Sequence, residues 1–93
     1  MDNIGHSPSQ TGVKFFAGDK GYITYEWDSP EVFAIMHTVV EEAFRGQGVA
    51  KALLDAAVSF ARENGYKIRP VCPYAEKVLR RDPQYNDILT DSI

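Results

Sequence analysis

The chain has 93 residues, 44% of them apolar and 25% charged, the composition of one ordinary globular domain. A net charge of −3 argues against a nucleic-acid partner, and no run approaches the ~20 apolar residues that cross a bilayer. The single cysteine excludes an internal disulfide and a thiolate zinc cluster, so we expect no metal site. Without a basic or apolar leader at the N-terminus, the expected setting is a reducing cytoplasm.

The first half of the chain has the pattern of an antiparallel meander. Residues 1–12 are polar and are expected to form a flexible N-terminus, with no role for His6. Strands are predicted over residues 13–17, 22–27 and 32–40. Short turns rich in Gly, Asp, Ser and Pro separate them, which favours antiparallel pairing of neighbours.

The second half predicts a strand–helix–strand crossover. Residues 48–63 have apolar positions at helical spacing, and the sequence Asn64-Gly65 stops that helix. A short strand at 67–71 follows, and the crossover length makes it parallel to strand 32–40. A final short helix is predicted over 74–81. The fold class is therefore α+β, with a mixed antiparallel/parallel sheet, a domain over 13–89 and a tail over 90–93.

A glycine-rich turn joins the long strand to the central helix. Its residues are Arg45, Gly46, Gln47, Gly48, Val49 and Ala50. Such a turn directs unpaired backbone N–H groups and the positive end of the helix dipole at one point, which suits a phosphate or pyrophosphate. The other interpretation is a turn that only connects two elements.

The turn also matches a family motif. Arg45, Gly48 and Ala50 occupy the fixed places of Arg/Gln-x-x-Gly-x-Gly/Ala, the pyrophosphate signature of GNAT-type N-acetyltransferases. Together with His37-Thr38 before the turn and Cys72-Pro73-Tyr74 after it, the chain resembles the short GNAT-like proteins over 13–89. The resemblance implies a minimal GNAT-like fold that binds acetyl-CoA as co-substrate and transfers acetyl to an unidentified amine.

The same resemblance implies where acetyl-CoA lies. Its pantetheine amides would pair with the backbone of Val39 and Val40, and its pyrophosphate would rest on residues 45–50. Tyr74 would lie near the thioester, although the family's tyrosine is typically further along the helix. Lys77, with Arg80 and Arg81, could attract the phosphates; a solvated helix face is the alternative.

Two residues are candidates for chemistry. Cys72 falls at the carboxyl end of the second parallel strand, where open sheets bind ligands, and could carry the acyl group or protonate the leaving thiolate. The other interpretation is that Cys72 is a small buried side chain that only packs in the core. His37 could carry a proton if strand pairing brings it to Cys72. Its alternative is a histidine hydrogen-bonded within the sheet.

Parts of a full GNAT enzyme are missing from the pattern. The N-terminal helical region and the last strands, which shape the acceptor pocket, are not predicted, and a homodimer could complete that pocket. The aromatic residues of the strands could line an acceptor groove or build core; they are Tyr22, Tyr25, Trp27 and Phe33. Two other functions therefore stay open: an acyl-CoA-binding module without catalysis, and an interaction domain with a structural glycine turn.

Overall fold

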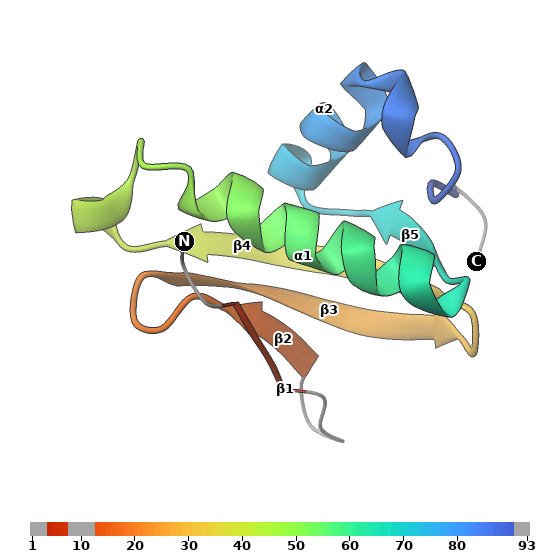
Figure 1. Cartoon of the computed structure of the whole chain (residues 1–93), viewed down its shortest axis with the longest axis horizontal. Helices are drawn as coiled ribbons and strands as arrows, with labels where there is room; N and C mark the ends of the chain where they lie inside the picture. Colours follow the sequence, from red (N-terminus) through yellow and green to blue (C-terminus); the bar gives the residue numbers. More distant parts are fainter. Residues whose placement is uncertain (1–3, 8–12, 91–93) are drawn as a thin grey trace.

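The computed structural model describes residues 4–7 and 13–90. Within them, five strands form one sheet in the order β1-β2-β3-β4-β5, with helices along it (Figure 1). The strands are β1 (Gly5–Ser7), β2 (Val13–Phe16), β3 (Gly21–Ser29), β4 (Val32–Val40) and β5 (Lys67–Pro70). The helices are α1 (Val49–Asn64) and α2 (Pro73–Arg81), and two short 3-10 turns are η1 (Glu42–Phe44) and η2 (Pro83–Tyr85).

The sheet changes from antiparallel to parallel at its last pair. Strands β1 to β4 pair antiparallel in sequence order, and β5 lies parallel to β4 after the α1 crossover. The predicted mixed sheet and α+β class are confirmed. Beyond η2 the chain follows the outer edge of β5, where the N–H of Ile68 donates to the carbonyl of Ile88 (2.6 Å) and the N–H of Thr90 donates to the carbonyl of Ile68 (3.0 Å). The predicted tail thus begins with a paired residue, and residues 91–93 lie outside the described part.

Strand β1 lies inside the segment that was predicted to be flexible. It pairs with β2, and the ring of His6 stacks on Phe15 at 4.2 Å and meets the edge of Phe60 at 4.6 Å. The imidazole Nε2 also forms a hydrogen bond with the hydroxyl of Tyr25. These tertiary contacts hold β1 on the sheet and give His6 a structural place in the fold. Residues 1–3 and 8–12 of the predicted flexible segment lie outside the described part.

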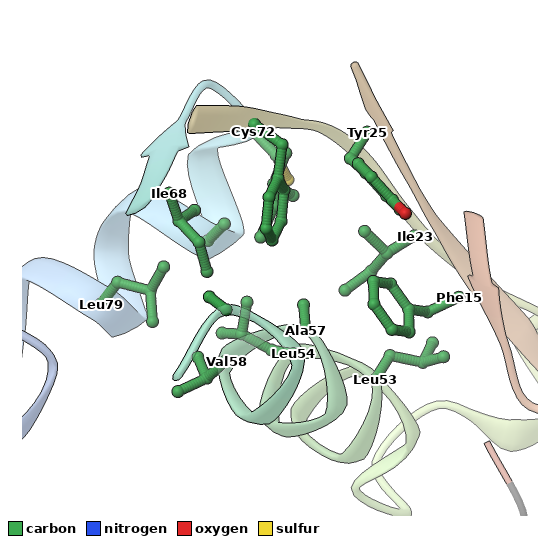
Figure 2. Packing of buried hydrophobic residues seen from close by; sticks show 14 of the residues in the cluster. Phe15, Ile23, Tyr25, Leu53, Leu54, Ala57, Val58, Ile68, Cys72 and Leu79 are labelled. Carbon is green, nitrogen blue, oxygen red and sulfur yellow. The ribbon is translucent and has the colours of Figure 1, made fainter. Parts of the chain in front are cut away.

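One hydrophobic core lies between α1 and one face of the sheet. Strand residues Phe15, Ile23 and Tyr25 point from the sheet toward the helix, as Figure 2 shows. The helix contributes Leu53, Leu54, Ala57, Val58 and Ala61 to this core. Ile68 of β5 and Leu79 of α2 close its far side. Because α1 covers one face only, the strands alternate between core residues and residues on an open face.

Strand β4 contains a bulge near its middle. Thr24 pairs with His37 and Tyr25 pairs with Ile35, so Met36 has no partner on β3. An extra residue of this kind bends its strand and shifts the alternation of its side chains by one position.

The bulge coincides with the point where β4 and β5 separate. Their last pair is Ile35 with Pro70. The carbonyl of Ile35 then accepts from the N–H groups of both Val71 and Cys72, at 3.0 and 2.9 Å. Beyond this point β4 continues for five residues beside α2 instead of beside a strand.

Candidate functional site

The glycine turn presents an open N-terminus of α1. Gly46 and Gly48 have φ of 81° and 82°, the left-handed region that glycine adopts without strain. A Cβ added to either residue would meet no atom within 4 Å, so the space over the turn is free. The first turn of α1 holds no acidic residue, and Gly48 caps it without a side chain. Its N–H groups and the helix dipole therefore remain available to an anion.

The other residues of the motif hold this turn in place. The Nε of Arg45 donates to the carbonyl of Val40 (3.3 Å), which ties the turn to the end of β4. Gln47 is exposed, and its amide lies 3.5 Å from the carbonyl of Ala43. Val49 is buried in the core and Ala50 is half-buried, so each can offer a ligand only its backbone.

Beyond the bulge, the backbone of β4 alternates between β3 and the gap beside α2. The N–H of Glu41 donates to the carbonyl of Lys20 on the β3 side (2.8 Å), and Tyr22 of β3 lies opposite Val39. By alternation, Val39 directs its backbone groups toward β3, whereas Thr38 and Val40 direct theirs toward the gap. The expectation for Val39 is therefore corrected: the backbone that faces the gap is that of Thr38 and Val40.

The thiol of Cys72 closes the inner end of this gap. Cys72 is buried, precedes the first residue of α2, and has its Sγ 3.4 Å from Oγ1 of Thr38. Burial alone would raise the pKa of this thiol. Hydrogen bonds from the Thr38 side chain and from the backbone N–H groups of Ala75, Tyr74 and Thr38 outweigh burial and hold the pKa below its ordinary value.

His37 does not form a pair with Cys72. It is exposed, and alternation along β4 places its side chain on the open face of the sheet, opposite to Thr38. The expectation of a Cys72–His37 pair is corrected: the partner of the thiol is Thr38.

Tyr74 lies between α2 and α1, near a polar group that the sequence did not reveal. Lys51, in the first turn of α1, bonds to Asp55 (2.8 Å) and to the hydroxyl of Tyr85 (3.2 Å), and these bonds raise its pKa to about 12. Burial raises the pKa of Tyr74, opposed by the charge of Lys51. Lys51 is exposed, and its contact with η2 comes only from the tertiary fold.

Lys77 belongs to a separate basic groove on α2. The groove has a volume of about 690 Å³ and its lining includes Lys77, Arg80 and Arg81 together with Val71 and Pro73. No residue of the glycine turn lines it. The structure thus gathers the three predicted cations in one place without joining them to the turn.

The sequence profile of the GCN5-related N-acetyl-transferase family matches residues 14–88. The chain belongs to this family. Protein NATD1 of Xenopus tropicalis is 35% identical over 65 residues, which are 70% of this chain and 60% of that protein. Protein NATD1 of Homo sapiens is 34% identical over 65 residues, 70% of this chain and 58% of that protein. The chain thus spans about three fifths of the length of these curated relatives.

Solved structures support the same family and fold. A GCN5-like candidate N-acetyltransferase from Staphylococcus aureus is 34% identical, with a TM-score of 0.75 over 100% of this chain and 94% of that one. An aminoglycoside acetyltransferase from an uncultured soil metagenomic sample is 15% identical, with a TM-score of 0.54 over 91% of this chain and 63% of that one. The second likeness shows the fold alone. The predicted GNAT relationship is confirmed.

Two further findings concern membranes and metals. None of the helices in the described part is long and apolar enough to span a membrane. Among residues 4–7 and 13–90, no three His, Cys, Asp or Glu side chains gather in a way that could hold a metal ion.

Proposed function

We propose that this GNAT-family protein binds acetyl-CoA and transfers its acetyl group to an amine. One observation carries the proposal: the open N-terminus of α1 at Gly48 lies next to the gap beside β4, and Cys72 lies at the inner end of that gap. The pyrophosphate would rest on the N–H groups of the glycine turn. The pantetheine amides would pair with the backbone of Thr38 and Val40, which an extended amide ligand can use as a strand edge.

In this arrangement the thioester lies near Cys72. The amine nitrogen attacks the thioester carbon, the carbon–sulfur bond breaks, and the departing CoA sulfur needs a proton. The Cys72 thiol can supply it, because Thr38 and the N–H groups at the start of α2 stabilise the thiolate that remains. The same low pKa also suits a covalent route, in which the Cys72 thiolate first takes the acetyl group from CoA and then yields it to the amine.

His37 is our candidate for the base that accepts the proton of the amine. It is exposed on the open face, one residue before Thr38, and so approaches the edge of β4 from the side opposite to the glycine turn's helix. An imidazole in that place can accept the proton that the amine loses as the new bond forms.

The proposal is tested by calorimetric titration with acetyl-CoA and, separately, with CoA. Binding in the micromolar range is expected for the wild type and its loss for Gly48→Glu, which places a carboxylate where the pyrophosphate would lie. Gly65→Glu is the matched control, because Gly65 is also left-handed (φ 72°) and open but caps the other end of α1. Equal binding by both variants would refute the site.

Intact-mass spectrometry after incubation with acetyl-CoA separates the two routes. An acetyl group on the wild type but not on Cys72→Ala would support the covalent route. Turnover with no acetylated protein would support direct transfer. Binding of CoA without turnover by any amine would leave an acyl-CoA-binding module, and no binding at all would leave an interaction domain.

A further inference from the structure

The face of the sheet opposite α1 is open in the described part of the chain. Alternation places on it the side chains between the core positions of β2, β3 and β4. Its exposed members include Lys14, Tyr22, Glu26, His37 and Val39. Tyr22 and Val39 are 37% exposed each and lie opposite one another, so they form an apolar patch at the end of this face where β4 leads into the glycine turn.

A hollow lies on this face beside the turn between β2 and β3. It has a volume of about 330 Å³, and Phe16 and Tyr22 supply its aromatic surface. Asp19 from the turn and Glu41 from the end of β4 supply two carboxylates. Lys14 is the cation in its lining. Two carboxylates and one ammonium leave a formal charge of −1, so the hollow favours a cation over an anion.

The aromatic surface of the hollow already holds an ammonium group. The Nζ of Lys14 lies 5.9 Å from the centre of the Phe16 ring and 5.6 Å from that of Tyr22, within the range of cation–π attraction. The ring faces can also cover methylene groups. Aromatic rings beside carboxylates therefore suit an ammonium on an apolar stem.

The face continues from the hollow toward His37. Val39 follows Tyr22 across the strands, and His37 lies two residues before Val39, about 7 Å along β4. Thr24 pairs with His37 on one side and with Lys14 on the other, and its Oγ1 is buried without a hydrogen-bond partner among the residues that the structure describes. A polar hydrogen brought along this path would satisfy it.

From these contacts we propose that the open face binds a linear polyamine as the acetyl acceptor. One ammonium group lies in the hollow between Asp19 and Glu41, the methylene chain lies across Tyr22 and Val39, and the terminal amine reaches His37 at the edge of β4. The role as acceptor rests on the function proposed above. The binding itself does not depend on it.

Binding is tested by NMR titration of the ¹⁵N-labelled protein with spermidine. The expected chemical-shift changes concentrate on the amides of residues 14–22 and 41. The dissociation constant for spermidine should rise as salt is added. Asp19→Asn with Glu41→Gln should weaken binding at least tenfold. Glu31→Gln with Glu63→Gln is the matched control: it removes two exposed carboxylates elsewhere and should change the affinity less than twofold.

Three outcomes overturn the inference. Shifts that avoid the hollow would refute the location. Equal weakening by the two double variants would reduce the effect to net charge, and equal binding of the uncharged 1,8-octanediol would reduce it to apolar contact. The titration needs no acetyl-CoA, so failure of acetyl-CoA to bind in calorimetry would remove the proposed function and leave this result standing.

Turnover supplies the second test. Mass spectrometry should find acetylspermidine after incubation with acetyl-CoA, and Asp19→Asn with Glu41→Gln should raise KM for spermidine while the affinity for acetyl-CoA is unchanged. Acetylation of a lysine peptide with no acetylation of spermidine would overturn the polyamine assignment and point to a protein acceptor.

Discussion

The thiol of Cys72 and the hydroxyl of Thr38 lie 3.4 Å apart, and their contact joins the start of α2 to the far half of β4. Cys72 lies beyond the end of β5 at Pro70, and Thr38 pairs with Ile23 of β3 but with no residue of β5. The contact thus spans the gap in which we place the thioester, and its chemistry can be tested without a substrate.

Replacing Thr38 by valine should make the thiol less reactive. The hydroxyl is one of the groups that lower the pKa of Cys72, so its removal raises the pKa and reduces the thiolate fraction at neutral pH. Alkylation by iodoacetamide should slow roughly two- to fivefold at pH 7.5. Thr38→Ser keeps the hydroxyl and should react like the wild type. An identical pH profile for all three proteins would contradict the assigned role of Thr38.

Replacing His37 by glutamine should lower turnover without weakening acetyl-CoA binding. If His37 accepts the proton of the amine, kcat should fall roughly 100-fold, in the range usual for loss of general base catalysis. Calorimetry should give an unchanged Kd, since the ring lies on the open face. Partial rescue by added imidazole would support a proton-transfer role, whereas unchanged kcat would exclude it.

The contact between His6 and Tyr25 should make stability depend on pH. Burial lowers the pKa of His6 in the folded protein, below its usual value of 6.5, and the unfolded chain therefore binds the proton first as pH falls. The free energy of unfolding should therefore decrease as the pH falls below about 6.5, because the unfolded state binds more protons than the folded state. Urea denaturation at pH 7.5, 6.5 and 5.5 measures this decrease.

His6→Gln is the comparison for that experiment. It should be less stable at pH 7.5, because it loses the ring contacts with Phe15 and Phe60, yet its stability should change less between pH 7.5 and 5.5. Parallel curves for the two proteins would show that His6 does not carry the pH dependence.

The ion pair between Asp28 and Arg69 should stabilise the end of the sheet away from the glycine turn. The carboxylate accepts from Nε at 2.6 Å and from the second guanidinium nitrogen at 3.1 Å, and the two side chains are 12% and 28% exposed. The hydrogen bond to Arg69 lowers the pKa of Asp28. Asp28→Asn should cost about 1–3 kcal/mol in chemical denaturation. If Asp28→Asn costs the same free energy of unfolding in a protein that already carries Arg69→Met, a direct pair is contradicted.

Local signals account for the parts of the fold that the sequence predicted. The alternation of 22–27, the helical spacing before Asn64-Gly65 and the proline at the start of α2 depend on residues within a few positions of one another. Gly65 indeed ends α1 in the left-handed conformation. The glycine turn was predictable for the same reason, since strand, turn and helix lie in one continuous stretch.

The missed features depend on distant partners. Strand β1 forms because the ring of His6 fits among Phe15, Tyr25 and Phe60, which come from three other elements. The link between Lys51 and Tyr85 likewise joins residues 34 positions apart. Thr38 became visible as the thiol's partner only once the pairing of β4 was known, since an unpaired Met36 has no local signature.

Met36 sets the phase of every residue that follows it in β4. If Met36 were paired in regular alternation instead of bulged, His37 would turn toward α1 and the thiol, and Thr38 would turn out to the open face. The same sequence in a strand without the bulge would thus carry an imidazole beside Cys72 instead of a hydroxyl. The bulge at Met36 therefore decides which of the two side chains meets the sulfur.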